Sequence, residues 1–201
     1  MLIINHQINS IGQLQNTPKK FGVEVDLRAY NNRIILNHEP FLEGEDFEEF
    51  LKHYHHAYLI LNIKCEGIER LVIGLMDKFR IRDYFLLDVT PPFIFKLVNQ
   101  GISKIAVRFS EMESIETCLN LKGKLEWVFV DNLTHLPVEH DAFKTLRKYF
   151  KLCIVSPELL NRNEIESVKE ILKDNPVDAV LTDKIYDWEE LAEQKKEKNK
   201  C

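Results

Sequence analysis

Several features that define other classes of protein are missing from this chain. No apolar run approaches the roughly 18 residues of a membrane-spanning helix. No basic segment precedes the first apolar stretch, so we expect no signal peptide. No Gly-x-Gly-x-x-Gly motif and no P-loop follows that stretch. We therefore expect neither a transmembrane protein nor a nucleotide-binding fold of those two kinds.

Cysteine is also scarce, and the chain has no excess of positive charge. The four cysteines, Cys65, Cys118, Cys153 and Cys201, form no Cys-x-x-Cys pair, which is typical of free thiols in a reducing cytoplasm. A nucleophilic cysteine is the less favoured alternative. With 27 Lys and Arg against 32 Asp and Glu, the net charge is -5, so we expect no nucleic-acid partner. The length of 201 residues is that of one domain, which needs no disulfide or structural metal.

Short apolar runs, by contrast, recur along the whole sequence. They predict strands at 2–5, 21–27, 33–37, 58–63, 84–87, 104–107, 126–130, 152–155 and 177–181. Most are continuously apolar and rich in β-branched or aromatic residues, which is typical of parallel strands buried on both faces. Helical periodicity predicts helices at 66–79, 91–99, 111–121, 141–150 and 163–173.

This alternation of strands and helices favours an α/β fold. The later strands end 20 to 27 residues apart, somewhat closer than the roughly 31 residues of an average (β/α)8 unit. We predict a small TIM (β/α)8 barrel, a single domain over residues 1–188. A doubly wound open sheet is the alternative. Residues 189–201 are mostly charged, and we expect a frayed helix or a disordered tail there.

Polar residues stand at or just past the predicted strand ends, where barrel enzymes place their chemistry. In chain order they are His6, Glu24, Asp26, Asn62, Lys64, Asp88, Arg108, Asp131, Ser156 and Asp183. For Asp88, Asp131, Ser156 and Asp183, a helix N-cap is the favoured interpretation. A cation gains nothing at a helix N-terminus, so Lys64 and Arg108 are candidates for binding an anion. The structural alternative for Arg108 is an ion pair with Asp88 or Asp131.

Glu24 and Asp26 lie two residues apart on one predicted strand, so their side chains share a face. Inside a barrel, two adjacent carboxylates need a cation or a shared proton, and a divalent metal is the simple solution. The alternative is that both carboxylates face solvent, with Val23 and Val25 in the core.

Five segments, in this order, resemble the glycerophosphodiester phosphodiesterase family: Ile-Ile-Asn-His at 3–6, Gly-Val-Glu-Val-Asp-Leu at 22–27, Ile-Leu-Asn-His-Glu-Pro at 35–40, Leu-Asn-Ile-Lys at 61–64, and Pro-Val-Asp-Ala-Val-Leu-Thr-Asp at 176–183. The family has a first strand ending in His-Arg-Gly, then a Glu-x-Asp strand, a His-Asp, a Glu-x-Lys strand, and a last strand ending in Thr-Asp. The barrels of phosphatidylinositol-specific phospholipase C are a looser match.

The resemblance implies a barrel that hydrolyses a glycerophosphodiester or a similar small or lipid-derived phosphodiester, so the partner would be a small molecule or a lipid headgroup. Histidines suit this chemistry because each can donate or accept a proton near pH 7. Carried over by position, the site consists of His6 and His38 as the catalytic pair, Glu24, Asp26 and Asn62 as metal ligands, and Lys64 as a substrate-binding cation.

The sequence departs from the family pattern at three positions. Gln7 and Ile8 replace the Arg and Gly that follow the first His, so a phosphate clamp is missing, and we expect Lys64 and Arg108 to replace it. Asn62 replaces a Glu, so a divalent cation (Mg or Ca) is expected to bind weakly or not at all. Two alternatives stay open: a degenerate barrel that binds a phosphorylated ligand without turnover, and a lyase that forms a Schiff base on Lys64.

A second group of histidines, His53, His55 and His56, precedes the third barrel strand. It lacks a His-Glu-x-x-His pattern and belongs to the barrel end opposite the presumed site. We expect it to serve solvation or helix capping. The sequence leaves the oligomeric state open.

Overall fold

Eight short apolar segments pair side by side in parallel and close into a barrel. The computed structural model describes residues 1–137 and 141–198. The barrel strands are β1 (Leu2–Asn5), β2 (Gly22–Tyr30), β5 (Leu59–Ile63), β6 (Tyr84–Leu87), β7 (Ala106–Phe109), β8 (Trp127–Val130), β9 (Lys151–Val155) and β10 (Ala179–Thr182). β1 pairs with both β2 and β10, so the first and last strands are neighbours. This confirms the small TIM barrel and excludes the open sheet.

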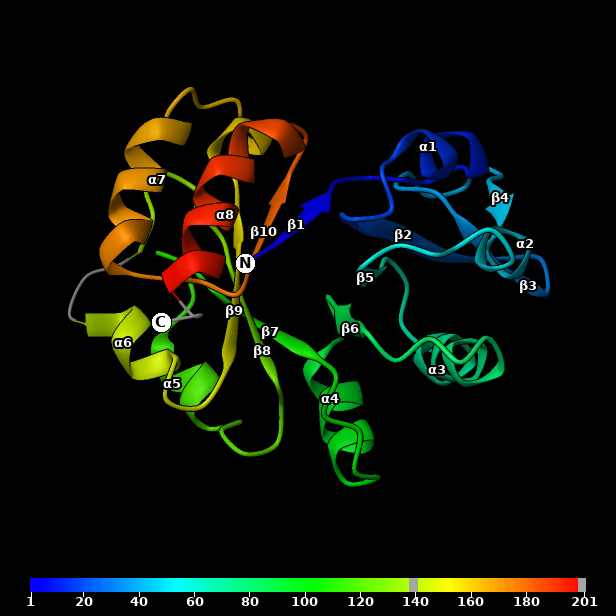
Figure 1. Ribbon diagram of the computed structural model, residues 1–201. Coiled ribbons are helices and arrows are strands. Elements are labelled where there is room, and N and C mark those ends of the chain that lie inside the picture. The colour runs from blue at the N-terminus through cyan, green and yellow to red at the C-terminus, as the bar shows by residue number, and fades with distance from the viewer. Residues whose placement is uncertain (138–140, 199–201) are drawn as a thin grey trace.

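Closure depends on the contact between β6 and β7. Within the described residues it consists of one parallel bridge between Leu86 and Ile105, and the Leu86 amide donates to the Lys104 carbonyl over 2.9 Å. The other neighbouring strands share registers of two to five residue pairs. Figure 1 shows β2, β5 and β6 on one side and β7 to β10 on the other, with β1 beside β10 between them.

The helices lie around the strands (Figure 1). They are α1 (Ile11–Asn16), α2 (Phe47–Leu51), α3 (Glu69–Lys78), α4 (Pro91–Val98), α5 (Ile115–Leu119), α6 (Ala142–Leu146), α7 (Ile165–Asp174) and α8 (Glu189–Lys198), with short 3-10 helices η2 (Pro157–Leu160) and η3 (Ile185–Trp188). No helix in the described part of the chain is long and apolar enough to cross a membrane.

β2 is longer than its neighbours and carries an extra hairpin. Beyond the barrel it pairs antiparallel with β3 (Arg33–Leu36), which in turn pairs with β4 (Glu45–Asp46). The turn is Asn31-Asn32, and Asn31 has a positive φ of 44°, which Asn tolerates better than most residues. The loop between β3 and β4 begins at the mouth of the barrel, because the Asn37 amide donates to the Asp26 carbonyl.

Alternation along the strands produces two apolar layers. One fills the barrel interior and contains Ile4, Ile60, Phe85, Leu87, Ala106, Trp127, Phe129, Cys153, Val155, Ala179 and Leu181. The other lies between strands and helices and includes Val23, Val25 and Leu27 of β2. Glu24 and Asp26 alternate with these valines, so they face the interior.

The end of the chain, where we expected a frayed helix or a disordered tail, is helical over most of its length. Residues Glu189–Lys198 form helix α8, whose Leu191 and Ala192 are buried against the outer apolar layer. These two apolar contacts attach the start of the helix to the barrel. Residues 199–201, with Cys201, lie outside the described part of the chain.

Candidate active site

The interior of the barrel mouth holds a compact polar cluster of Glu24, Asp26, Asn62 and Lys64. Asp26 and Asn62 are direct partners across the β2–β5 pairing. The Asn62 side-chain amide donates to Glu24 Oε1 over 3.0 Å, and Lys64 Nζ lies 3.3 Å from Asp26 Oδ1. Both carboxyl groups are fully buried. Glu24 and Asp26 therefore face the barrel interior and not solvent. Val23 and Val25, which alternate with them, are buried on the outer face of β2.

The loop after β1 closes over these carboxyl groups. Gln7 adopts a positive φ of 51°, and its backbone amide donates to Glu24 Oε2 over 2.9 Å. Asn9 forms two hydrogen bonds with Asp26: its Nδ2 donates to Asp26 Oδ2, and its Oδ1 accepts from the Asp26 amide, both over 2.8 Å. The position that holds an Arg in the family therefore contributes its main chain to the Glu24 carboxyl group.

Burial and the neighbouring Asp26 raise the pKa of Glu24 from 4.5 to about 8. Hydrogen bonds from Gln7 and Asn62 and the charge of Lys64 act in the opposite direction but do not cancel these effects. Around neutral pH, Glu24 is therefore mostly protonated, which is the shared-proton solution for two adjacent carboxyl groups.

The oxygens of this cluster are a partial fit to a divalent cation. Asp26 Oδ1 and Asn62 Oδ1 are buried and accept no hydrogen bond, and such oxygens are the ligands that Mg²⁺ and Ca²⁺ prefer. Of the three side chains that could bind the cation, Glu24, Asp26 and Asn62, the last is a neutral amide. The Lys64 ammonium, in addition, already lies beside Asp26. Among the described residues, no three His, Cys, Asp or Glu side chains are placed to hold a metal ion.

His6 follows β1 directly and lies at the same mouth. Its Nδ1 is 3.1 Å from Asp183 Oδ1, which follows β10, so the first and last strands bring this pair together. The Asp183 amide donates to Glu158 Oε1, and the same carboxylate accepts hydrogen bonds from the hydroxyls of Thr182 and Ser156. The backbone of Asp183 is thus held by a carboxylate of η2, and the residue is not the helix N-cap favoured from the sequence, because the N-cap of η3 is Lys184.

His38 lies on the loop between β3 and β4. Its Nδ1 is 2.7 Å from Oε1 of the adjacent Glu39, and half of its side chain is exposed. Arg28 of β2 holds the loop: its Nε and Nη2 donate to the His38 carbonyl over 3.1 and 2.7 Å, and its Nη1 donates to the Lys64 carbonyl over 3.0 Å. In the described structure no hydrogen bond joins the His6 and His38 rings.

Arg108 of β7 also points into the mouth, but its guanidinium group is already paired with two carboxylates. Its Nε and Nη2 donate to the two oxygens of Asp88 over 2.6 and 3.0 Å, and its Nη1 donates to Asp131. The guanidinium also lies over the Phe129 ring. Of the two interpretations of Arg108, the structure contains the ion pair, and the charge available to an anion is correspondingly reduced.

The remaining candidates do not contribute to this mouth. His56 Nε2 contacts the Thr17 carbonyl at 2.8 Å, and His53 lies 3.9 Å from Glu49, both at the opposite end of the barrel. Cys65, Cys118 and Cys153 are free thiols. Burial raises the pKa of Cys118 to about 12 and that of Cys153 well above its ordinary value, so neither is a nucleophile.

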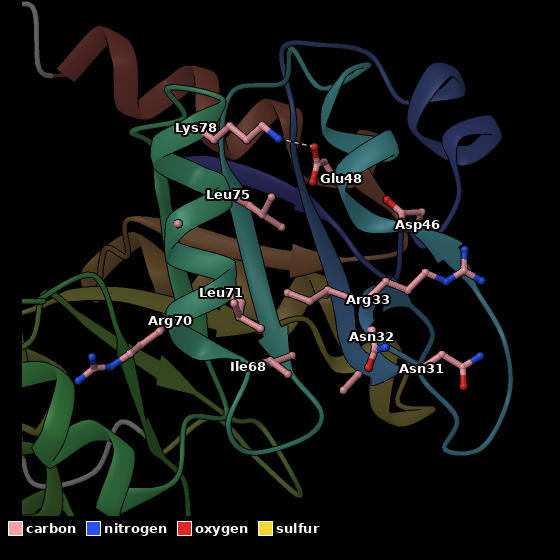
Figure 2. A pocket seen from close by; sticks show the side chains of 13 residues that line it. Asn31, Asn32, Arg33, Asp46, Glu48, Ile68, Arg70, Leu71, Leu75 and Lys78 are labelled. Atoms are coloured by element: carbon pink, nitrogen blue, oxygen red, sulfur yellow. Dashed lines mark hydrogen bonds and ion pairs between the residues drawn. The ribbon is translucent and has the colours of Figure 1, made fainter.

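A groove of about 880 Å³ lies outside the barrel, between α3 and the β2–β3 hairpin. Figure 2 shows Leu71 and Leu75 extending from α3 into it, with the ion pair between Lys78 and Glu48 across one end. Its lining contains no histidine, and Ala29, which lines it, alternates with the inward-facing residues of β2. The groove is thus separated from the mouth by the barrel wall.

Three residues of the mouth could not be singled out from the sequence: Asn9, Arg28 and Glu158. Each has at least one contact at the mouth with a partner 10 to 36 positions away along the chain. The neighbouring sequence does not show whether a polar residue in a loop, or at the end of a long strand, contacts distant residues or only solvent.

No model of a known protein family and no curated protein matches the sequence. Solved structures do match the fold. A protein from Agrobacterium tumefaciens assigned to the glycerophosphoryl diester phosphodiesterases has a TM-score of 0.71 at 12% identity, over 97% of this chain and 98% of its own. A glycerophosphoryl diester phosphodiesterase from Parabacteroides distasonis has 0.69 at 14%, over 96% and 86%.

The third is a glycerophosphodiester phosphodiesterase from Agrobacterium tumefaciens, with a TM-score of 0.64 at 11% identity over 90% of this chain and 96% of its own. At these identities the matches establish architecture. The chain therefore has the barrel fold of the glycerophosphodiester phosphodiesterases, in agreement with the resemblance drawn from its five sequence segments.

Proposed function

We propose that this protein is a phosphodiester hydrolase acting on a glycerophosphodiester or a similar small phosphodiester. The observation that carries the proposal is the mouth of the barrel, where His6, held by Asp183, lies one residue from the loop amide that binds Glu24. The likeness in fold to three glycerophosphodiester phosphodiesterases gives independent support.

His6 and His38 are the proposed acid and base. Each has its Nδ1 beside a carboxylate, Asp183 or Glu39, which leaves Nε2 as the nitrogen that exchanges a proton. One histidine removes the proton from a water or a substrate hydroxyl as its oxygen attacks phosphorus. The other protonates the alkoxide that leaves as the phosphorus–oxygen bond breaks. Lys64 contributes positive charge for the phosphoryl oxygens, and Arg108 contributes it to the extent that Asp88 and Asp131 release it.

Glu24, Asp26 and Asn62 are the residues that would hold a divalent cation, which would offset the charge on the phosphoryl oxygens when bound. We propose that this binding is weak, because Asn62 is neutral and Lys64 competes for Asp26. Replacing Asn62→Glu adds the third carboxylate and should tighten Mg²⁺ or Ca²⁺ binding at least about tenfold, measured by calorimetry. Sub-micromolar binding by the natural protein would contradict this account.

The Schiff-base lyase has less support. Lys64 lies 3.3 Å from Asp26, and an ion-paired ammonium is not the neutral amine that attacks a carbonyl. Borohydride should therefore trap no adduct with carbonyl substrates. The degenerate barrel that only binds a phosphorylated ligand is the remaining alternative, and it is separated from the hydrolase by turnover.

The deciding experiment is hydrolysis of glycerophosphocholine and of a chromogenic bis-aryl phosphate by the whole chain. His6→Asn and His38→Asn should each lower kcat by about 10²–10⁴, the usual contribution of a general acid or base. His53→Asn, at the other end of the barrel, is the matched control and should leave kcat unchanged. Phosphate binding without turnover by the natural protein would establish the degenerate barrel instead.

A further inference from the structure

The loops around the barrel mouth carry large apolar side chains that face solvent. Phe41 is 95% exposed and lies beside the exposed Leu42 on the loop between β3 and β4. Met112, 85% exposed, lies between β7 and α5, and Leu133 follows β8. We call these four residues the apolar rim.

The apolar rim lies on two sides of the mouth. Phe41 and Leu42 belong to the hairpin that extends β2, whereas Met112 and Leu133 follow β7 and β8, three and four strands away around the barrel of eight. An object in contact with both sides therefore covers the opening. Because the side chains come from separate loops, they form no single groove or helix-sized face.

The backbone at Phe41 adds a second observation. Its φ is 64°, in the left-handed region that bulky residues rarely adopt. The loop thus holds an aromatic side chain in solvent at a conformational cost, although a turn of the same shape is easier for Gly or Asn. Such strain is a starting point for a functional hypothesis when it is observed directly.

We propose that the apolar rim inserts into the surface of a zwitterionic lipid layer and that the substrate is a phosphodiester lipid taken from that layer. This inference rests on the proposed function and names the physical form of its substrate. A fluid lipid surface accepts separate side chains without a complementary shape, whereas a folded partner needs a continuous, well-packed patch.

Charge selects the kind of lipid. The exposed Glu39 and Glu43 flank Phe41 and Leu42, whereas Glu111 and Glu113, which flank Met112, are only partly exposed and accept hydrogen bonds from the chain. The exposed carboxylates beside Phe41 oppose an anionic surface, but they are compatible with headgroups whose outermost group is a choline or ethanolamine cation. Exposed cations gather instead at the opposite end of the barrel, in the loops before the strands, at Lys19, Lys52, Arg80, Lys122 and Lys148.

The test is co-sedimentation of the whole chain with phosphatidylcholine vesicles. We expect binding by the natural protein, and the double variant Phe41→Ser, Leu42→Ser should weaken the partition constant by about tenfold or more, the loss expected for two inserted apolar side chains. Met112→Ser should weaken it by a smaller factor. Phe95→Ser is the matched control, because Phe95 is 69% exposed on α4, outside the apolar rim, and it should bind as the natural protein does.

The inference would be overturned by absence of binding to phosphatidylcholine, by equal binding of the double variant, or by a dimer in solution that the double variant dissociates. The last would identify the apolar rim as a contact between copies of this chain. Stronger binding to phosphatidylserine vesicles would also contradict it, since the cationic end would then be docked. Vesicle binding with turnover of neither soluble diesters nor the vesicle lipid would instead reject the proposed function and the lipid substrate, and would leave only the docking of the apolar rim.

Discussion

At the scale of single residues, the main feature of the barrel mouth is a set of ionisable side chains that are buried by the fold. Glu24 and Asp26 are buried on one strand face, and a single ammonium group, that of Lys64, lies beside Asp26. Arg108 is in the converse position, as one guanidinium shared by two carboxylates. Removing a partner from such groups leaves an uncompensated charge, which costs more than the pair itself contributes.

The first prediction concerns Glu24 and pH. Burial and Asp26 raise its pKa from 4.5 to about 8, so the folded protein keeps a proton that the unfolded chain releases above about pH 4.5. The resulting stability is complete below that pH and is lost as pH rises through about 8. Glu24→Gln cannot lose this proton, so its Tm should exceed that of the natural protein at pH 8.5 by at least about 2–4 °C, the shift that 1 kcal/mol gives at this chain length.

Thermal melts at pH 5 and pH 8.5 check this, and the advantage of the variant should shrink at the lower pH. Divalent cations should stabilise the natural protein more at the higher pH, because a bound cation favours the ionised carboxylate. Equal pH dependence of the two proteins would show that Glu24 titrates normally.

The second prediction concerns Arg108. Arg108→Ala leaves the mostly buried Asp131 without its cation, and burial already raises the pKa of Asp131. We expect a loss of about 2–4 kcal/mol, below that of a fully buried pair because a third of the Arg108 side chain is exposed. The corresponding fall in Tm is about 5–15 °C.

Arg82→Ala is the control, since Arg82 forms an exposed ion pair with Asp77 and should change Tm by no more than about 2 °C. Arg108→Ala combined with Asp131→Asn should recover part of the loss. If Arg108→Ala instead leaves Tm unchanged and lowers turnover by about 10²–10³, the guanidinium serves the substrate rather than the fold.

At the scale of elements, the sequence predicts best those strands whose ends coincide with a change in polarity. β1 and β6 are observed at the residues predicted, and β9 begins one residue earlier. β7 begins two residues later than predicted and also ends two residues later, at Phe109. The prediction ended the strand before Arg108 because a charged residue is a typical sign of a strand end. Helix α5 is shorter than its periodicity suggested, since residues 110–114 turn back through a bridge between Ser110 and Glu113.

The short elements around the mouth were not predictable in this way. α1 and α2 have six and five residues, too few for a clear period, and both are capped by side chains, Ser10 and Asp46. The site shows the same division. His6 and Lys64 could be singled out because they follow strand ends, and Glu24 and Asp26 because they share one face of an apolar strand. Arg28 donates to carbonyl groups that only the fold brings near it.

The third prediction tests the role of Arg28 in positioning the loop of His38. Arg28→Met keeps the length of the side chain and removes the donors to His38 and Lys64. We expect kcat on a soluble diester to fall by about tenfold or more, because displacement of a catalytic group by about 1 Å is sufficient for a loss of this size. Amide exchange in residues 37–44 should become faster, and Tm should change little.

Arg28→Lys is the informative comparison. A lysine keeps the charge but cannot donate in a fixed fork, so it should recover less than half of the lost activity. Full recovery by lysine would mean that charge near the mouth matters, rather than the tie between the two carbonyl groups.

At the scale of the whole molecule, both signs of charge occur at each end of the barrel. At the end where helices finish, the exposed Asp77, Asp83 and Asp174 accompany lysines and arginines. At the mouth, the exposed Glu39, Glu43 and Asp183 are accompanied by Lys184. An anionic substrate therefore approaches an acidic opening, and its association rate should rise with ionic strength rather than fall.

The single bridge between Leu86 and Ile105 has a further consequence: the barrel has a seam between β6 and β7, whereas β1 and β10 close the other side with four residue pairs. Residues 1–101 contain the strands from β1 to β6, and the rest of the chain contains β7 to β10. The amide of Leu86 should exchange with solvent faster than that of Leu181 in β10, because one bridge is easier to open than a full register of parallel pairs. Two polypeptides divided between Gly101 and Ile102 should each be insoluble alone, since each exposes apolar strand edges, yet co-expression should reconstitute one folded barrel whose parts co-purify.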